Sequence, residues 1–295
     1  MRARIYLTVI MAGAFFAIFL SGISHAASVR LSYGFNVGAT YRVTEQHYDV
    51  GKTVTEINMM GQPQKFETAS DRVSSGTWTA KGVSKDTRGV KLAVEYGEHK
   101  GGDRWGGNMM DSAQILGSSS AEIVIHSTDG AVQYEVAPSA EQIVEVIYKS
   151  RFLWMPKLPK EFVRKGYSFT HEYVLKSGMY NIKSTDEYSL VGIKGNFVTF
   201  DVETTQVSII KMSEAPKLEG VPAGMGMNMA DMKLAFKGEG TAVFDVKEGI
   251  FIEREGKMSY SDMGSVQGAS AMPGGVTFSS RTEGVVKYKW EMERQ

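Results

Sequence analysis

The stretch VKYKWEM, residues 286–292, carries the pattern that decides the fold. Its apolar and aromatic side chains alternate with charged ones, so the two sets fall on opposite faces of an extended chain. An antiparallel sheet covered on one side only has this arrangement. The stretch therefore predicts a strand with a dry face of Val286, Tyr288, Trp290 and Met292 and a wet face of Lys287, Lys289 and Glu291.

The same alternation recurs through most of the chain, and turn residues separate its segments. The clearest further strands and hairpin turns are expected at residues 90–96, 167–175 and 196–210, at Asp129-Gly130 and at Glu248-Gly249. These features predict an all-β, mainly antiparallel protein. We expect a large curved sheet or open barrel in two similar lobes with one bracing helix.

The helix is expected in the central stretch APSAEQIVEVIYKSRFLWMPKLPKEFVRKG, residues 137–166. Ser139 can cap its first turn, and apolar residues such as Ile143 and Ile147 recur at helical spacing on one face. The helix should end near Arg151, because Pro156 follows shortly after it. An amphipathic helix must bury its apolar stripe, so we expect it to pack on the concave side of the sheet.

The chain on either side of this stretch follows one plan. Gly38 precedes Tyr41 by the same spacing as Gly166 precedes Phe169, and each pair leads into a long alternating strand. Whether this similarity reflects a duplication is left open. The predicted domains are a signal peptide at 1–26, an N-terminal β lobe at 27–137, a helix and proline-containing connector at 138–160 and a C-terminal β lobe at 161–295.

The first residues predict export from the cytoplasm. Arg2 and Arg4 precede an apolar run at residues 5–20, which the small residues Ser24 and Ala26 follow. This is the order of a secretory signal peptide, and the run is shorter than the roughly 20 residues of a membrane-spanning helix. We expect cleavage after Ala26 and a mature protein that is periplasmic or secreted and does not span the membrane.

Composition narrows the function classes further. The chain contains no cysteine, which excludes disulfides and thiol chemistry. It has 33 basic and 33 acidic residues with the signs interspersed, so it lacks the basic patch of a nucleic-acid-binding protein. No nucleic-acid partner is therefore expected.

Three motifs resemble an uncharacterised family of exported bacterial proteins, classed only as a domain of unknown function. They are LSYGFNVGATYR at residues 31–42, WMPKLP at residues 154–159 with Gly166, and GEGTAVFD at residues 238–245 with Gly249. The resemblance covers most of the mature chain and implies a β-rich exported protein with no known catalytic residues.

The middle motif departs from the family's commoner form. An acidic residue and a tryptophan are expected after the glycine, and this chain has Tyr167 and Ser168. A looser likeness is to periplasmic lipoprotein carriers, whose half-barrels hold acyl chains. That likeness implies an apolar ligand and concerns the fold alone.

A methionine-rich loop is the most pointed local feature. Met225, Met227, Met229 and Met232 lie within eight residues. Neutral sulfur ligands favour Cu(I), so these methionines are a candidate metal site. The alternative is that they fill gaps where a flexible loop crosses an apolar surface. No other cofactor is expected.

Aromatic side chains on the expected inward faces form the other candidate site. If a curved sheet this large does not fill its interior, a lipid or hydrophobic peptide can lie against these residues. If the interior is filled, they are simply core, as in most proteins. The candidate ligand-cavity residues are Phe169, Tyr173, Phe200, Phe244, Tyr288 and Trp290.

No catalytic residues are predicted. The serines at residues 118–120 lack the second glycine of a nucleophile elbow. Acidic pairs such as Asp186-Glu187 are interpreted as solvated faces of strands. We therefore expect a non-enzymatic exported protein that binds an apolar, lipid-like ligand in the periplasm. The alternatives are an envelope assembly factor that contacts another protein through exposed strand edges and, more weakly, a Cu(I)-binding protein.

Overall fold

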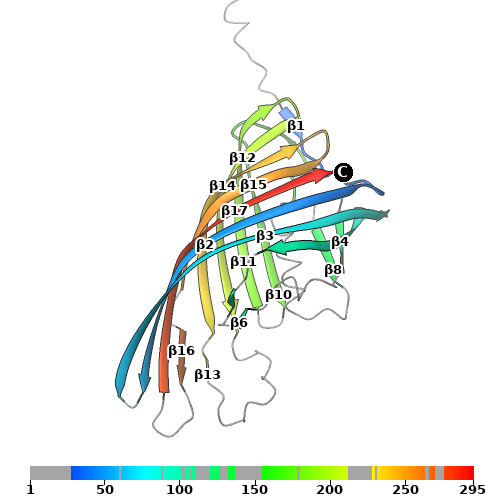
Figure 1. Ribbon diagram of the computed structural model, residues 1–295. Helices are drawn as coiled ribbons and strands as arrows, with labels where there is room; N and C mark the ends of the chain where they lie inside the picture. Colours follow the sequence, from blue (N-terminus) through cyan, green and yellow to red (C-terminus); the bar gives the residue numbers. More distant parts are fainter. Residues whose placement is uncertain are drawn as a thin grey trace, which may run out of the picture.

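The computed structural model describes the chain from residue 28 to residue 295 with several gaps. The described ranges are 28–59, 61–87, 89–100, 104–105, 108–109, 120–126, 132–136, 155–177, 180–211, 228–229, 231–262, 266–269 and 276–295. All regular structure in these ranges is β-strand, and the neighbouring strands are antiparallel (Figure 1). The all-β, mainly antiparallel prediction is confirmed.

Most of the strands belong to one sheet of 13 strands. Eleven of them follow one another in the spatial order β10 (Ser168–Ser177), β11 (Tyr180–Lys194), β12 (Phe197–Ile210), β14 (Met232–Asp245), β15 (Ile250–Asp262), β17 (Val276–Arg294), β2 (Thr40–Met59), β3 (Gln62–Lys85), β4 (Gly89–Lys100), β7 (Ser120–His126) and β8 (Val132–Val136). Two short strands, β13 (Asn228–Met229) and β16 (Val266–Ala269), lie off this path, with β16 pairing to both β13 and β17. Within the described chain the path ends at β10 and β8, so the sheet is open.

Two small sheets accompany the large one. They pair β1 (Ser28–Arg30) with β9 (Phe162–Arg164) and β5 (Arg104–Trp105) with β6 (Asn108–Met109). The first of them ties the beginning of the described chain to the residues that lead into β10.

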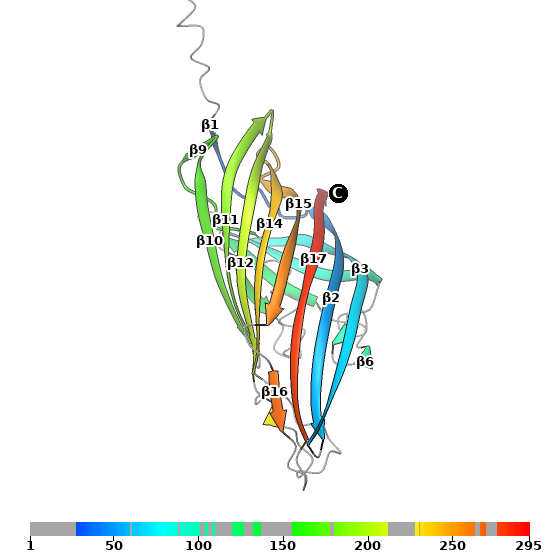
Figure 2. The same cartoon turned by 90° about the vertical axis from the view of Figure 1, so that its left-hand side faces the viewer.

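Strand β17 joins the two halves of the sequence. It pairs with β15 on one side and along its whole length with β2 on the other. The sheet is therefore continuous across both halves, and it curls strongly, so that β10 to β12 lie behind β2 to β4 (Figures 1 and 2). The boundary between two lobes stays a prediction.

The wet and dry faces fall where the sequence pattern places them. Trp290 and Met292 are buried, whereas Lys287 and Glu291 are exposed. Strand register extends the same alternation across the sheet, because directly paired residues point to the same face. We call the buried side the inner face and the other side the outer face.

The apolar core occupies one end of the inner face. Aromatic side chains from several strands meet there edge to face, as Phe200 meets Tyr188 and Phe244 meets Phe251. Such contacts stabilise a core beyond the burial of area alone. The largest fully buried side chains are Tyr41, Trp78, Leu92, Tyr188, Leu190, Phe200, Phe244 and Phe251.

A segment without regular structure, residues 31–36, covers this end of the core. Gly34 donates its N–H to the carbonyl of Gly249 at 2.9 Å, and the Tyr33 hydroxyl donates to the carbonyl of Pro156 at 2.9 Å. The segment therefore holds the β14–β15 turn and the chain around Pro156 together. The buried side chains of the cover are Leu31, Tyr33, Phe35, Met155, Leu158 and Val163.

Beyond the core, tyrosine rings on the inner face lie over glycines of the neighbouring strand. Tyr260 is paired with Gly284 and Tyr288 with Gly256. A Cβ on Gly284 would lie 2.5 Å from the Tyr260 ring, and one on Gly256 would lie 2.7 Å from the Tyr288 hydroxyl. Only glycine allows these rings to lie flat on the sheet.

The bracing helix expected at residues 139–151 lies outside the described residues. Of the proline-containing connector, residues 155–160 are described, and Met155, Pro156 and Leu158 are buried against the core. The expected signal peptide at 1–26 also lies outside the described residues. Within the described ranges, we find no helix whose length and hydropathy suit it to crossing a membrane.

Candidate functional site

A small cavity opens on the inner face where the apolar core ends. Its volume is about 180 Å³. Strands from both halves of the sheet contribute to its walls, because the sheet curls and brings β10 to β12 towards β15, β17 and β2. The cavity is lined by Glu45, His47, Tyr173, Asp186, Thr204, Gln206, Arg254, Met258, Tyr288, Lys289 and Trp290.

A buried ion pair forms the centre of this site. Arg254 Nη1 lies 3.2 Å from Asp186 Oδ2, and the two side chains are only 7% and 2% exposed. The Thr204 hydroxyl donates to Asp186 Oδ1 at 2.7 Å and accepts from Arg254 Nη2 at 3.2 Å. The threonine therefore links both members of the pair across β12.

Two tyrosines complete the surroundings of the guanidinium. Arg254 Nη1 donates to the Tyr188 hydroxyl at 3.1 Å, and the Tyr188 and Tyr288 rings each lie 5.8 Å from Cζ. Burial alone lowers the pKa of Arg254, but Tyr188, Asp186 and Tyr288 raise this pKa well above its ordinary value. The guanidinium is therefore charged at every physiological pH.

Tyr173 and Tyr188 keep their protons over the same range. Burial, with a smaller contribution from Asp186, raises the pKa of Tyr173 to about 12. Burial also raises the pKa of Tyr188. Both hydroxyls are therefore protonated at neutral pH.

The opposite wall is formed by β2. Glu45 is 3% exposed, and its Oε2 lies 3.9 Å from His47 Nε2. On β10, the Tyr173 hydroxyl donates to Gln206 Oε1 at 3.4 Å. The cavity thus presents a carboxylate, an imidazole, an amide and hydroxyls on a partly aromatic wall, which suits a compact hydrogen-bonding group.

The presence of an ion pair here calls for a reason other than stability. Burying two charges is costly, and apolar replacement of such a pair is often neutral or stabilising by about 1–4 kcal/mol. Titratable groups gathered in a cavity are a common feature of functional sites. We therefore treat the cavity as the candidate functional site.

The six aromatic residues predicted to line a ligand cavity separate into two groups. Tyr173, Tyr288 and Trp290 line the cavity. Phe200 and Phe244 are fully buried in the core, and Phe169 stacks on Tyr188 with ring centroids 5.0 Å apart. The structure therefore brings three of the six to one site and packs the others into the core.

Two of the four predicted copper ligands lie within the described residues. Met225 and Met227 lie outside the described residues, Met229 is in β13, and Met232 begins β14. Among the described residues, no group of three or more histidine, aspartate or glutamate side chains is placed to hold a metal ion.

The sequence interpretation missed Asp186 and Arg254. Asp186 was interpreted as part of a solvated face, and this was wrong: it is 1% exposed, while its neighbour Glu187 is exposed. A signal was present in the chain, because Asp186 alternates with the apolar-face residues Tyr188 and Leu190. A charged residue at an inward position is the mark of such a site.

Comparisons with known proteins give distant structural likeness only. No protein-family model matches the chain, and no curated protein matches it. A lipovitellin structure concerned with lipid–protein interactions is similar over 88% of this chain and 26% of its own, with 9% identity and a TM-score of 0.43. The outer membrane protein OprG from Pseudomonas aeruginosa is similar over 88% of this chain and 99% of its own, with 8% identity and a TM-score of 0.27. The chain thus spans about a quarter of the lipovitellin chain, and at these scores the likenesses carry no functional inference.

Proposed function

We propose that this chain is an exported, non-enzymatic binding protein of the periplasm whose ligand is lipid-like. The polar end of the ligand occupies the cavity around Arg254 and Asp186, and its apolar part lies along the inner face next to the cavity. The sequence features at residues 1–26 support export. The inner face changes from a filled core to a polar cavity and then to a partly exposed apolar surface, and this change supports the ligand class.

This change along the inner face is the observation on which the proposal rests. On one side of the cavity the inner face is a filled core. On the other side it continues through Met258 to a pair of aromatic rings, Phe236 and Tyr260, whose centroids are 5.6 Å apart. These three side chains are only partly buried. A polar cavity beside a partly exposed apolar surface matches a ligand with one polar and one apolar end.

The size of the cavity agrees with this division. Pockets that enclose drug-sized ligands have volumes of roughly 300–1,000 Å³. A cavity of about 180 Å³ is too small for an acyl chain and large enough for a compact polar group. Tyr173, Gln206 and His47 line the cavity, and we expect their polar atoms to contact such a group.

A fluorescent probe with the same division tests the proposal. Dansyl-labelled undecanoic acid is titrated into the mature protein, and saturable, enhanced emission is the expected result. Gln206→Trp fills the cavity from β12 and should weaken binding at least about tenfold, since the polar end loses its place. Thr205→Trp is the matched control, because the neighbouring residue is exposed on the outer face.

Two results would contradict the proposal. One is the absence of saturable emission with the unaltered protein. The other is equal binding by the two tryptophan variants, which would show that the probe does not bind in the cavity. Circular dichroism of both variants shows whether each keeps the β-sheet of the parent.

A further inference from the structure

The inner cavity has more buried acidic groups than buried basic groups in its walls. Among the described residues that line it, the inner face contributes two carboxylates, those of Glu45 and Asp186, which are 3% and 1% exposed. The same face contributes one guanidinium, that of Arg254. The balance of fixed charge around the cavity is therefore negative, and this balance bears on the chemistry of the ligand's polar end.

The guanidinium of Arg254 is already engaged by groups of the protein. Nη1 donates to Asp186 and to the Tyr188 hydroxyl, and Nη2 donates to the Thr204 hydroxyl. The rings of Tyr188 and Tyr288 each lie 5.8 Å from Cζ. An anionic group of a ligand would have to displace the Asp186 carboxylate from Nη1, and the displaced carboxylate would then repel it. The cavity is therefore poorly suited to an anion.

Glu45 stands apart from this ion pair. Trp290 of β17 is paired with Arg254 on one side and with Glu45 on the other, so it lies between the two charged residues on the inner face. Because neighbouring strands are about 4.8 Å apart, the backbones of Arg254 and Glu45 are separated by roughly 10 Å. His47 is the lining residue nearest to Glu45 along β2, with Nε2 3.9 Å from Oε2. The negative charge of Glu45 therefore belongs to the wall opposite Arg254.

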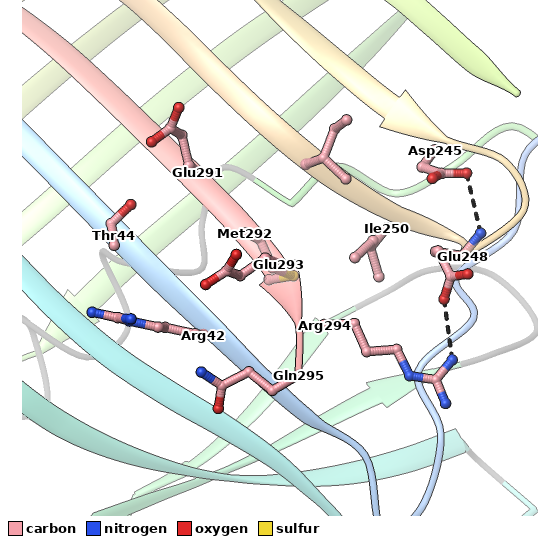
Figure 3. A pocket seen from close by; sticks show the side chains of 11 residues that line it. Arg42, Thr44, Asp245, Glu248, Ile250, Glu291, Met292, Glu293, Arg294 and Gln295 are labelled. Atoms are coloured by element: carbon pink, nitrogen blue, oxygen red, sulfur yellow. Dashed lines mark hydrogen bonds and ion pairs between the residues drawn. The ribbon is translucent and has the colours of Figure 1, made fainter.

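The charged residues that flank Trp290 in β17 belong to the outer face. Lys289 is counted in the lining of the cavity, but its Nζ lies 2.8 Å from Glu291 Oε1, and its side chain is 41% exposed. Glu291 itself lines a separate groove on the outer face, together with Arg42 and Glu293 (Figure 3). These charges lie on the far side of the sheet, so they do not offset the charge of Glu45 inside the cavity.

Aromatic rings form much of the remaining wall. Tyr173, Tyr288 and Trp290 line the cavity together with Glu45. The faces of tyrosine and tryptophan rings attract cations, and aromatic surroundings are a common means of recognising ammonium ligands. A carboxylate adds a charge-assisted hydrogen bond to an ammonium N–H, which is about twice as strong as a bond between neutral groups. Carboxylate and rings thus occur together in a cavity of about 180 Å³, the scale of a compact head group.

We propose that the polar end of the ligand is an ammonium group, which binds to Glu45 and to the aromatic rings beside it; this assignment rests on the proposed function. The ligand is then a cationic amphiphile whose chain lies over Met258 and the rings of Phe236 and Tyr260. An acid on the same chain still binds through its apolar part, but its carboxylate meets the like charge of Glu45. The cavity should therefore distinguish an amine from an acid.

Calorimetric titration of the mature protein with dodecylamine and with dodecanoic acid tests this proposal. The two compounds have chains of equal length and are used below the concentrations at which they form micelles. At pH 8 the amine carries its proton, the acid has lost its proton, and an imidazole is ordinarily neutral. The amine should bind at least about tenfold more tightly than the acid, because the attraction between opposite charges is strong where water is largely excluded.

Two protein variants locate the preference. Glu45→Gln keeps the shape of the side chain and removes its charge, so it should reduce the preference for the amine at least about fivefold. Glu56→Gln is the matched control, because it removes the same charge from an exposed position of β2 that does not line the cavity. A preference set by the overall charge of the chain would fall equally in both variants.

The outcomes separate this proposal from the proposed function. Binding of neither compound would contradict both. Equal binding of the two compounds by the parent protein, or tighter binding of the acid, would overturn the ammonium assignment and leave a lipid-like ligand in place. An unchanged preference in folded Glu45→Gln, or equal losses in the two variants, would also overturn the assignment. Circular dichroism shows whether Glu45→Gln folds, and if it does not, the comparison of the two compounds in the parent decides.

Discussion

The hairpins that follow Gly38 and Gly166 share a backbone conformation. The two glycines have φ angles of 83° and 86°. Gly38 donates its N–H to the carbonyl of Gly82 at 2.7 Å, and Gly166 donates to that of Leu190 at 2.8 Å. In both hairpins the acceptor residue returns a hydrogen bond to the residue after the glycine.

The two halves are also alike in the register of the strand pair that follows each hairpin. The pairing of β3 with β4 shifts between Gly82 and Ser84, and the pairing of β11 with β12 shifts between Leu190 and Gly192. Each shift therefore falls directly after the residue that bonds the glycine. The shared detail favours a duplication of the two hairpins, a question that the sequence pattern leaves open.

The difference lies in the side chains that the shared backbone presents to the interior. The fifth residue after each glycine is Val43 in one hairpin and His171 in the other, and their cross-strand partners are Trp78 and Asp186. Trp78 is fully buried and packs near Trp290, with ring centroids 6.4 Å apart. Equivalent positions thus hold core in the first half and the ion pair of the candidate site in the second. A charged residue at an inward position, Asp186 where the first hairpin has Trp78, therefore distinguishes the site from packed core.

The largest expected effect comes from removing the carboxylate of Asp186. Asp186→Ala should lower the free energy of unfolding by about 3–5 kcal/mol, because it leaves Arg254 charged and buried without its carboxylate. The double variant Asp186→Leu with Arg254→Leu should recover most of the loss, since it makes the second hairpin apolar like the first. Urea denaturation measures both. If the single variant is as stable as the parent, the ion pair is not buried in solution.

The two glycine turns offer a smaller effect that should be equal in both halves. Gly38→Ala and Gly166→Ala each place a side chain at positive φ, which costs about 1–2 kcal/mol. An added Cβ meets no atom within 4 Å at either position, so the backbone alone sets the cost. Thermal or urea unfolding of the two variants provides the comparison. A large inequality between them would show that the two turns are not equivalent.

The smallest effect concerns pH. The pKa of Tyr173 rises from about 10 in the unfolded chain to about 12 in the fold. The folded state therefore holds the proton of Tyr173 more tightly than the unfolded chain does. The free energy of unfolding keeps its full value below pH 10 and falls as the pH rises towards 12. Tyr173→Phe should make the fall of unfolding free energy less steep in this window, and the fall that remains comes from Tyr188 and Tyr260, whose pKa values burial also raises. The two proteins should have the same slope below pH 10, and equal slopes between pH 10 and 12 would contradict the prediction.

The parts of the structure that follow from the sequence are those set by neighbouring residues. Alternation in residues 286–292 was enough to predict which side chains of β17 are buried, because a strand exposes its two faces in turn. The equal spacing from Gly38 to Tyr41 and from Gly166 to Phe169 predicted matching turns, because turn conformation also depends on neighbouring residues. Local rules of this kind identified the fold class, and three of the six residues predicted to contact a ligand line the cavity.

The remaining part depends on contacts between distant segments. Alternation places Asp186 on the inner face, but nothing near it in the chain indicates that Arg254 is its partner. The pairing of β15 with β17 ends at Glu253 and Glu291, and no residue type marks that point. Register between strands is decided by the whole sheet, so these features appear only in the folded protein.

The pairing of β17 with β2 has a consequence for how the protein forms. The first and last long strands of the described chain are neighbours, so β2 acquires one of its two partners only after nearly every other strand has been made. Folds dominated by such distant pairings form slowly, and their incomplete states expose unpaired, aggregation-prone strand edges. An incomplete chain therefore leaves one edge of β2 unpaired until β17 has been made.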